Sequence, residues 1–124
     1  MHQEFHKDDL IISTDPSRLD IRAIHAFLSK SYWAEGIPRE IVARSIRHSL
    51  CFGVYDGSSQ IGFAGVISDF ATYVYIADVY VVDSRRGKGV GRWLMSCIVS
   101  HPDLQGASSH ATFTDSIRSS DLHS

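Results

Sequence analysis

The sequence contains few cysteines and no apolar run long enough to cross a membrane. Its two cysteines, Cys51 and Cys97, lie far apart in apolar segments. That placement favours core filling in a reducing compartment over a disulfide framework. The polar stretch from Met1 to Asp9 does not have the composition of a signal peptide. We therefore expect a cytoplasmic protein without membrane contact.

Metal-ligand patterns are also lacking. The cysteines and the seven histidines do not combine into a zinc-ligand pattern, so no metal site is expected. We expect His2 and His6 to lie in a mobile N-terminus.

An excess of charge of one sign is absent as well. The formal net charge is −2, which excludes a chain that binds nucleic acid over its whole surface. With 124 residues, 44% hydrophobic and 21% charged, the composition is that of one small globular domain. The basic cluster from Arg85 to Arg92 is local, and it suits a small anionic ligand better than a duplex.

One stretch combines a strand, a basic glycine-rich loop and a helix. Tyr73–Val82 is a β-branched and aromatic run typical of a strand. After the loop, Val90, Leu94, Cys97 and Ile98 recur on one face of a helix. Glycines let backbone N–H groups converge, and a helix start adds partial positive charge, so this order predicts a phosphate site. The alternative is an ordinary strand-to-helix turn with solvated charges.

Two common phosphate loops do not fit this stretch. A Walker loop requires glycine where Val82 stands and serine or threonine where Gly89 stands. The dinucleotide fingerprint Gly-x-Gly-x-x-Gly fails because Gly91 follows Gly87-x-Gly89 one residue early.

The remaining pattern, Arg86-x-x-Gly89-x-Gly91, follows a valine-rich strand. It resembles the coenzyme A pyrophosphate loop of GNAT-type N-acetyltransferases, which reads Gln/Arg-x-x-Gly-x-Gly/Ala. The segment 61–65 is similar to that family's hairpin strand, and 32–38 resembles the substrate-side loop of a bacterial-type branch. The resemblance runs from about residue 10 to residue 105. It implies an α/β (α+β) fold with a mixed, mostly antiparallel sheet flanked by helices.

The rest of the chain has elements in the order that this fold needs. We expect strands at Leu10–Thr14, Leu50–Tyr55 and Gln60–Ile67, and helices at Asp20–Ser31 and Pro38–Ser49. An Asp-Gly turn at residues 56–57 predicts a hairpin.

The resemblance implies acetyl-CoA as cofactor and places most of its site in the loop. Backbone N–H groups near Val81 would bind the pantetheine and the thioester oxygen. The implied cofactor-binding residues are Val81, Val82, Arg86, Gly87, Lys88, Gly89, Val90, Gly91 and Arg92.

The amine acceptor would lie beside the central strand. Asp78, the only carboxylate within that strand, resembles the family's amine-side acid or base. Facing solvent or capping a backbone group is the alternative for Asp78. Tyr32 and Trp33 resemble substrate-side contacts, and a place in the core or a lid is their alternative.

The end of the sequence departs from the family pattern. Residues 107–124 are serine-rich and contain no tyrosine. We therefore expect a partial GNAT domain at 1–106 and an atypical tail at 107–124, without the usual C-terminal strand-helix-strand portion or the tyrosine that protonates the leaving thiolate. Codons for Asp115–Leu122 exist whose second reading frame spells Leu-Tyr-Ser-Lys-Phe-Gly-Phe, similar to the family's helix. We hypothesise a truncated or frame-shifted ending.

Such an ending would expose one edge of the central strand. An exposed edge favours pairing with another chain, as in a homodimer, or cover by a tail segment such as Ala111–Ile117. The function expected is an N-acetyltransferase that acts on a primary amine of a small molecule or protein. A catalytically impaired coenzyme A-binding fragment or interaction module of the same fold is the alternative. A nucleotide-binding protein of another fold is the third possibility.

Overall fold

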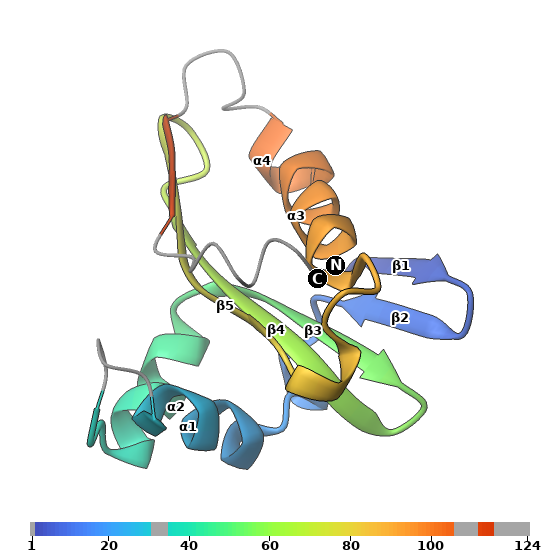
Figure 1. The fold of residues 1–124 in the computed structure, drawn as a ribbon. Helices are drawn as coiled ribbons and strands as arrows, with labels where there is room; N and C mark the ends of the chain where they lie inside the picture. The colour runs from blue at the N-terminus through green and yellow to red at the C-terminus, as the bar shows by residue number, and fades with distance from the viewer. Residues whose placement is uncertain (1, 31–34, 106–111, 116–124) are drawn as a thin grey trace.

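The computed structural model describes residues 2–30, 35–105 and 112–115, the last by its backbone alone. A six-stranded sheet runs in the order β1-β2-β3-β4-β5-β6 (Figure 1). The strands are β1 Glu4–Lys7, β2 Leu10–Ser13, β3 Leu50–Asp56, β4 Ser59–Ser68, β5 Tyr73–Val81 and β6 Thr112–Asp115. The helices are α1 Ile21–Lys30, α2 Arg39–Arg47, α3 Val90–Ser100 and α4 Pro102–Gln105, with short 3-10 turns η1 Pro16–Arg18 and η2 Asp83–Arg85.

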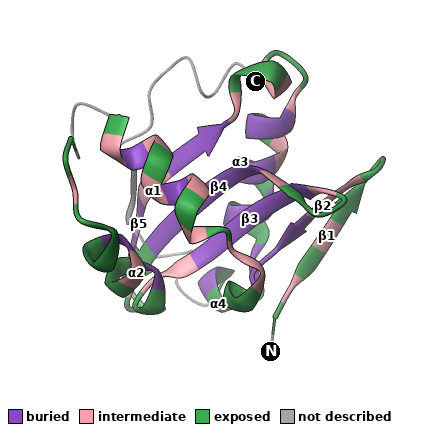
Figure 2. Cartoon of the chain, turned by 90° about the horizontal axis from the view of Figure 1, so that it is seen from below, coloured by how far each residue is buried: buried purple, intermediate pink, exposed green. Residues whose placement is uncertain are grey.

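Helices cover both faces of the sheet. The pair α1 and α2 lies on one face, and α3 with α4 lies on the other (Figure 1). Buried side chains of β3, β4 and β5 belong to two hydrophobic cores, one on each face of the sheet. Figure 2 shows these strands largely buried. Within the described ranges, no helix is both long enough and apolar enough to cross a bilayer.

The sequence expectations for β2 to β5, α1, α2 and α3 are confirmed to within two residues at each end. The order, the antiparallel pairing of β2 to β5 and the helices on both sides match the fold that the resemblance implies. Along α2, Val42 and Ile46 are buried, whereas Ile41 is 39% exposed.

The N-terminus corrects one expectation. His6 lies in β1, which pairs with β2 in antiparallel register, and His2 reaches Asp15 at 3.7 Å. The Thr14 N–H donates to the Gln3 carbonyl at 3.0 Å, which continues this pairing. This stretch was expected to be a mobile terminus, but hydrogen bonds to β2 hold its backbone in the sheet.

The far edge of the sheet takes one of the two expected forms. Residues 112–115 form β6, which pairs in parallel with β5 from Tyr73↔Thr112 to Ile76↔Asp115. A tail segment therefore covers the first part of β5, as one alternative predicted. The flanking residues of that expected segment, 111, 116 and 117, lie outside the described residues.

A bulge divides β5 into two parts. Gly65 pairs with Asp78 and Val66 with Ile76, so Ala77 is the extra residue. Before the bulge Val74 and Ile76 join the core under α3, and after it Val79 and Val81 do so. Because of the bulge, the next side chain after Ile76 to enter the core under α3 is that of Val79, three residues later. The same shift turns Asp78 toward the α1/α2 face.

Candidate functional site

The glycine-rich loop links the end of β5 to the start of α3. Gly87 and Gly89 both have a φ of 80°, a left-handed conformation that glycine adopts without steric cost. A Cβ added at either glycine would meet no atom of the described part of the chain within 4 Å. The loop therefore leaves open space beside its backbone, which a side chain would fill.

The start of α3 adds backbone donors to this loop. Gly89 is the N-cap, and no side chain of the described residues caps the helix. N–H groups in the first turn of a helix, here those of Val90, Gly91 and Arg92, lack intrahelical acceptors and lie at the positive end of the helix dipole. Gly91 is buried and Arg92 is exposed, so Gly91 offers only its backbone.

The arginines of the loop have separate roles. The guanidinium of Arg86 donates from Nε to the Val81 carbonyl at 3.1 Å, and its Nη1 lies 3.2 Å from the Asp83 carboxylate. Arg85 pairs instead with Asp56 in the β3–β4 hairpin. Arg86 is therefore held at the end of β5, while Arg85 links the loop to the neighbouring turn.

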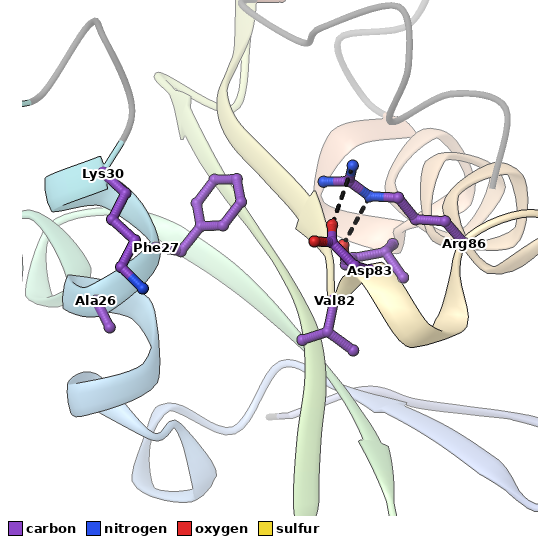
Figure 3. Close-up of a pocket in the computed structure, with 7 residues that line it drawn as sticks. Ala26, Phe27, Lys30, Val82, Asp83 and Arg86 are labelled. Carbon is purple, nitrogen blue, oxygen red and sulfur yellow. Dashed lines mark hydrogen bonds and ion pairs between the residues drawn. The ribbon is translucent and has the colours of Figure 1, made fainter.

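A cavity of about 470 Å³ lies between α1 and the end of β5 (Figure 3). Val81, Val82, Asp83 and Arg86 line it from the β5 side. From α1 it is lined by Ala26, Phe27 and Lys30. Sequence reasoning missed these α1 residues because their spacing shows only a helix, and not which strand the helix approaches.

The expected cofactor residues do not all line one cavity. Lys88, Gly89 and Val90 line a separate hollow of about 40 Å³, together with Trp93 and the β1–β2 hairpin. From that hairpin come Lys7, Asp8 and Leu10. The loop thus connects two hollows, one beside α1 and one beside the N-terminal hairpin.

The outer edge of β5 presents backbone groups beside the larger cavity. The Val82 N–H donates to the Ile61 carbonyl of β4 at 2.9 Å. Successive residues of an antiparallel strand direct their backbone groups to opposite sides, so the Val81 N–H is directed away from β4. Within the described residues, the β6 ladder ends at Ile76.

Asp78 stands in a row across the sheet with Gly65 of β4 and Cys51 of β3. Gly65 has no side chain, and the Phe63 ring lies 3.5 Å from the place where its Cβ would stand. Burial raises the pKa of the Cys51 thiol to about 12, and the negative charge of Asp78 adds to this effect. Cys51 is therefore a neutral core residue. Asp78 does not line the cavity beside α1.

The remaining predicted residues are Tyr32 and Trp33, which lie outside the described residues.

Tyr80 follows Asp78 on the same face and is buried. Its hydroxyl accepts a hydrogen bond from Gln60 Nε2 at 3.1 Å. Burial raises the pKa of Tyr80 to about 12, partly offset by that bond, so this phenol stays protonated.

The loop fits a phosphate-bearing cofactor in three respects. Its left-handed glycines leave open space that a Cβ would enter, the start of α3 supplies backbone N–H groups, and Arg86 is fixed beside it. Lys88 and Arg92 add exposed positive charge. Backbone N–H groups at a helix N-terminus are donors of the kind that binds phosphate groups in proteins.

Comparison with known proteins agrees with this geometry. The family model described as the acetyltransferase (GNAT) family matches residues 18–123. A protein of Gibberella zeae that is named as an acetyltransferase is 32% identical, with 84% of this chain and 69% of that protein covered.

Solved structures show the same fold. A GNAT-family protein of Xanthomonas campestris is 42% identical with a TM-score of 0.82, covering 92% of this chain and 79% of its own. A GNAT-family protein of Streptococcus pneumoniae has a TM-score of 0.62 at 18% identity, covering 96% of this chain and 77% of its own.

Proposed function

This chain belongs to the acetyltransferase (GNAT) family, and we propose that it transfers an acetyl group from acetyl-CoA to a primary amine of a small molecule or protein. The observation that carries this proposal is the loop between β5 and α3. It joins open left-handed glycines, uncapped helix N–H groups and a fixed arginine at the end of a strand whose outer backbone groups face away from β4.

The loop residues would hold the pyrophosphate of the cofactor. Gly87 and Gly89 allow close approach of the backbone, and the first turn of α3 donates N–H groups. Arg86, Lys88 and Arg92 supply positive charge. The side chains of Val81 and Val90 are buried in the core, so their contribution is through the backbone.

Acetyl-CoA, when bound, supplies an acetyl group activated as a thioester. The Val81 N–H, directed to the outer edge of β5, would donate to the acetyl oxygen as negative charge develops there. Asp78 would accept the proton of the incoming ammonium, directly or through water. The α1/α2 face, toward which the bulge turns Asp78, is then the acceptor side.

One sequence feature favours the second candidate function, a coenzyme A-binding module without turnover. The tyrosines of this sequence, Tyr32, Tyr55, Tyr73, Tyr75 and Tyr80, all precede α3, whereas the tyrosine expected to protonate the leaving thiolate would follow it. Tyr80, which precedes the loop, is held by Gln60 and packed against Phe27.

Two measurements on the full chain separate these functions. Thiol release from acetyl-CoA is followed with a panel of primary amines, and coenzyme A binding is followed by calorimetry. Amine-dependent thiol release supports transfer, whereas binding without release supports the second function. Heat of binding with ATP or NAD but none with coenzyme A overturns both. Cytoplasmic location, lack of nucleic-acid contact and a homodimer remain sequence predictions.

A further inference from the structure

An apolar patch lies on the α1/α2 face of the sheet, farther along β5 from Asp78. Ile67 pairs with Tyr75 across β4 and β5, and the alternation of side chains places Tyr73 on the same face. Ile67 is 49% exposed and Tyr73 is 42% exposed, while Tyr75 is half-buried. We call Ile67, Tyr73 and Tyr75 the tyrosine platform.

The two rings of the platform form an ordered surface. The Tyr73 and Tyr75 ring centroids are 6.5 Å apart, and their planes differ by 8°. The Asp69 carboxylate accepts N–H bonds from Ala71, Thr72 and Tyr73, and the Ser68 hydroxyl donates to the Tyr73 carbonyl at 2.7 Å. These bonds fix the start of β5, so Tyr73 enters the strand in a defined position.

The bulge makes the platform continuous with Asp78. If the strand alternated regularly through Ala77, Asp78 would face α3, as Val74 and Ile76 do. Because Ala77 is bulged out of the register, Tyr73, Tyr75 and Asp78 follow one another on one face. Asp78 pairs with Gly65, and Tyr75 pairs with Ile67. Gly65 and Ile67 are two residues apart on β4, so Asp78 and Tyr75 lie roughly 7 Å apart along the strand direction.

We infer that the tyrosine platform binds the body of the acceptor, and that the acceptor is a primary amine joined to an aromatic ring by a short aliphatic spacer. This inference rests on the proposed function and names its substrate class. A flat ring gains from stacking against two parallel phenols and from burial against Ile67. The ammonium of the same molecule then reaches Asp78, whose charge is opposite.

Kinetics with two matched amines test this class. Phenethylamine and n-butylamine share a primary amine and differ in the ring. We expect a lower KM for phenethylamine, and a KM increase of about fivefold to tenfold for it alone in Tyr73→Ala. Values for n-butylamine and acetyl-CoA stay unchanged. Tyr73→Phe keeps the ring and retains the low KM, which separates ring contact from loss of structure.

The matched control is Val99→Ala, because Val99 is 52% exposed on α3, on the opposite side of the sheet. This variant should leave both amines unaffected. Equal KM values for the two amines in the native chain, or an equal loss in the control, overturn the inference. A preference for spermidine over phenethylamine also overturns it, since a polycation needs charge rather than a ring.

A binding measurement separates this inference from the proposed function. Tyrosine ring resonances of the full chain are recorded by NMR while phenethylamine is added in the presence of coenzyme A. Shifts at Tyr73 and Tyr75 support the platform, even if no thiol is released, and in that case only transfer is overturned. Thiol release with n-butylamine and no ring shifts keeps the proposed function and rejects the platform.

Discussion

Phe27 of α1 stacks on Tyr80 of β5, with ring centroids 4.1 Å apart and planes that differ by 15°. The Tyr80 hydroxyl accepts from Gln60, whose side-chain carbonyl accepts the Asp20 N–H at 2.8 Å just before α1 begins. These contacts hold α1 against the strand that contains Asp78. They also set one wall of the cavity beside Arg86.

Phe27→Ala should therefore weaken both the fold and the cavity. The lost burial and stacking should lower the free energy of unfolding by about 1–3 kcal/mol, measured by urea denaturation. Phe70→Ala is the matched control, because Phe70 is exposed in the β4–β5 turn. A loss as large for Phe70→Ala would show that the stack is not the cause.

Gly89→Leu should remove coenzyme A binding. The side chain would enter the open space of the loop, and the φ of 80° would be strained. Gly36→Leu has the same strain at a φ of 75° away from the loop. Both should lose about 1–2 kcal/mol of stability, but only Gly89→Leu should lose affinity, by tenfold or more in calorimetry. Unchanged affinity removes the loop from the site.

Asp78→Asn should lower turnover on amines by about 10²-fold, because the amide cannot accept the ammonium proton. Coenzyme A affinity should stay unchanged, since the cofactor residues lie in the loop. Asp9→Asn, at an exposed position in the β1–β2 turn, is the control. Native rates for Asp78→Asn across pH would assign Asp78 a structural role.

Tyr55→Phe should leave the stability unchanged or raise it. The Tyr55 hydroxyl is buried and has no hydrogen-bond partner among the described residues, so its removal leaves no orphaned acceptor. Tyr80→Phe is the comparison, since it breaks the bond from Gln60 and should cost about 1 kcal/mol. A lower melting temperature for Tyr55→Phe would point to a partner for that hydroxyl.

His101 should make the fold sensitive to acid. It is 2% exposed, its Nδ1 accepts the Asp103 N–H at 3.0 Å, and its ring meets the edge of Phe52. Burial lowers the pKa of His101 below the ordinary 6.5, and the nearby Asp103 charge opposes this only in part. The unfolded chain therefore takes up the proton first.

The stabilisation from neutral His101 is present above about pH 6.5 and is lost as the pH falls toward the folded pKa. His101→Asn keeps a capping acceptor and removes the titration, so its unfolding free energy should depend less on pH between 7 and 5. His48→Asn changes an exposed histidine and is the control. An unchanged pH dependence in His101→Asn would contradict the prediction.

The sequence by itself determined most of the elements and the loop. The apolar runs at 50–55 and 60–67 and the helical spacing of Ile24 and Leu28 depend on neighbours along the chain, so they can be recognised from the local sequence. The order of strand, glycine loop and helix at residues 73–100 is likewise local, and it predicts a phosphate site without knowledge of the rest of the fold. The family followed from that stretch, and the comparisons confirm it.

Only the tertiary structure decided which segments meet. The pairing of polar β1 with β2, the α1 wall of the cavity and the pairing of β5 with β6 depend on contacts between distant residues. The bulge at Ala77 belongs to the same group. The run 73–82 looks continuous, but filling one core on both sides of the bulge requires an extra residue, and that residue turns Asp78 and the tyrosines to one face.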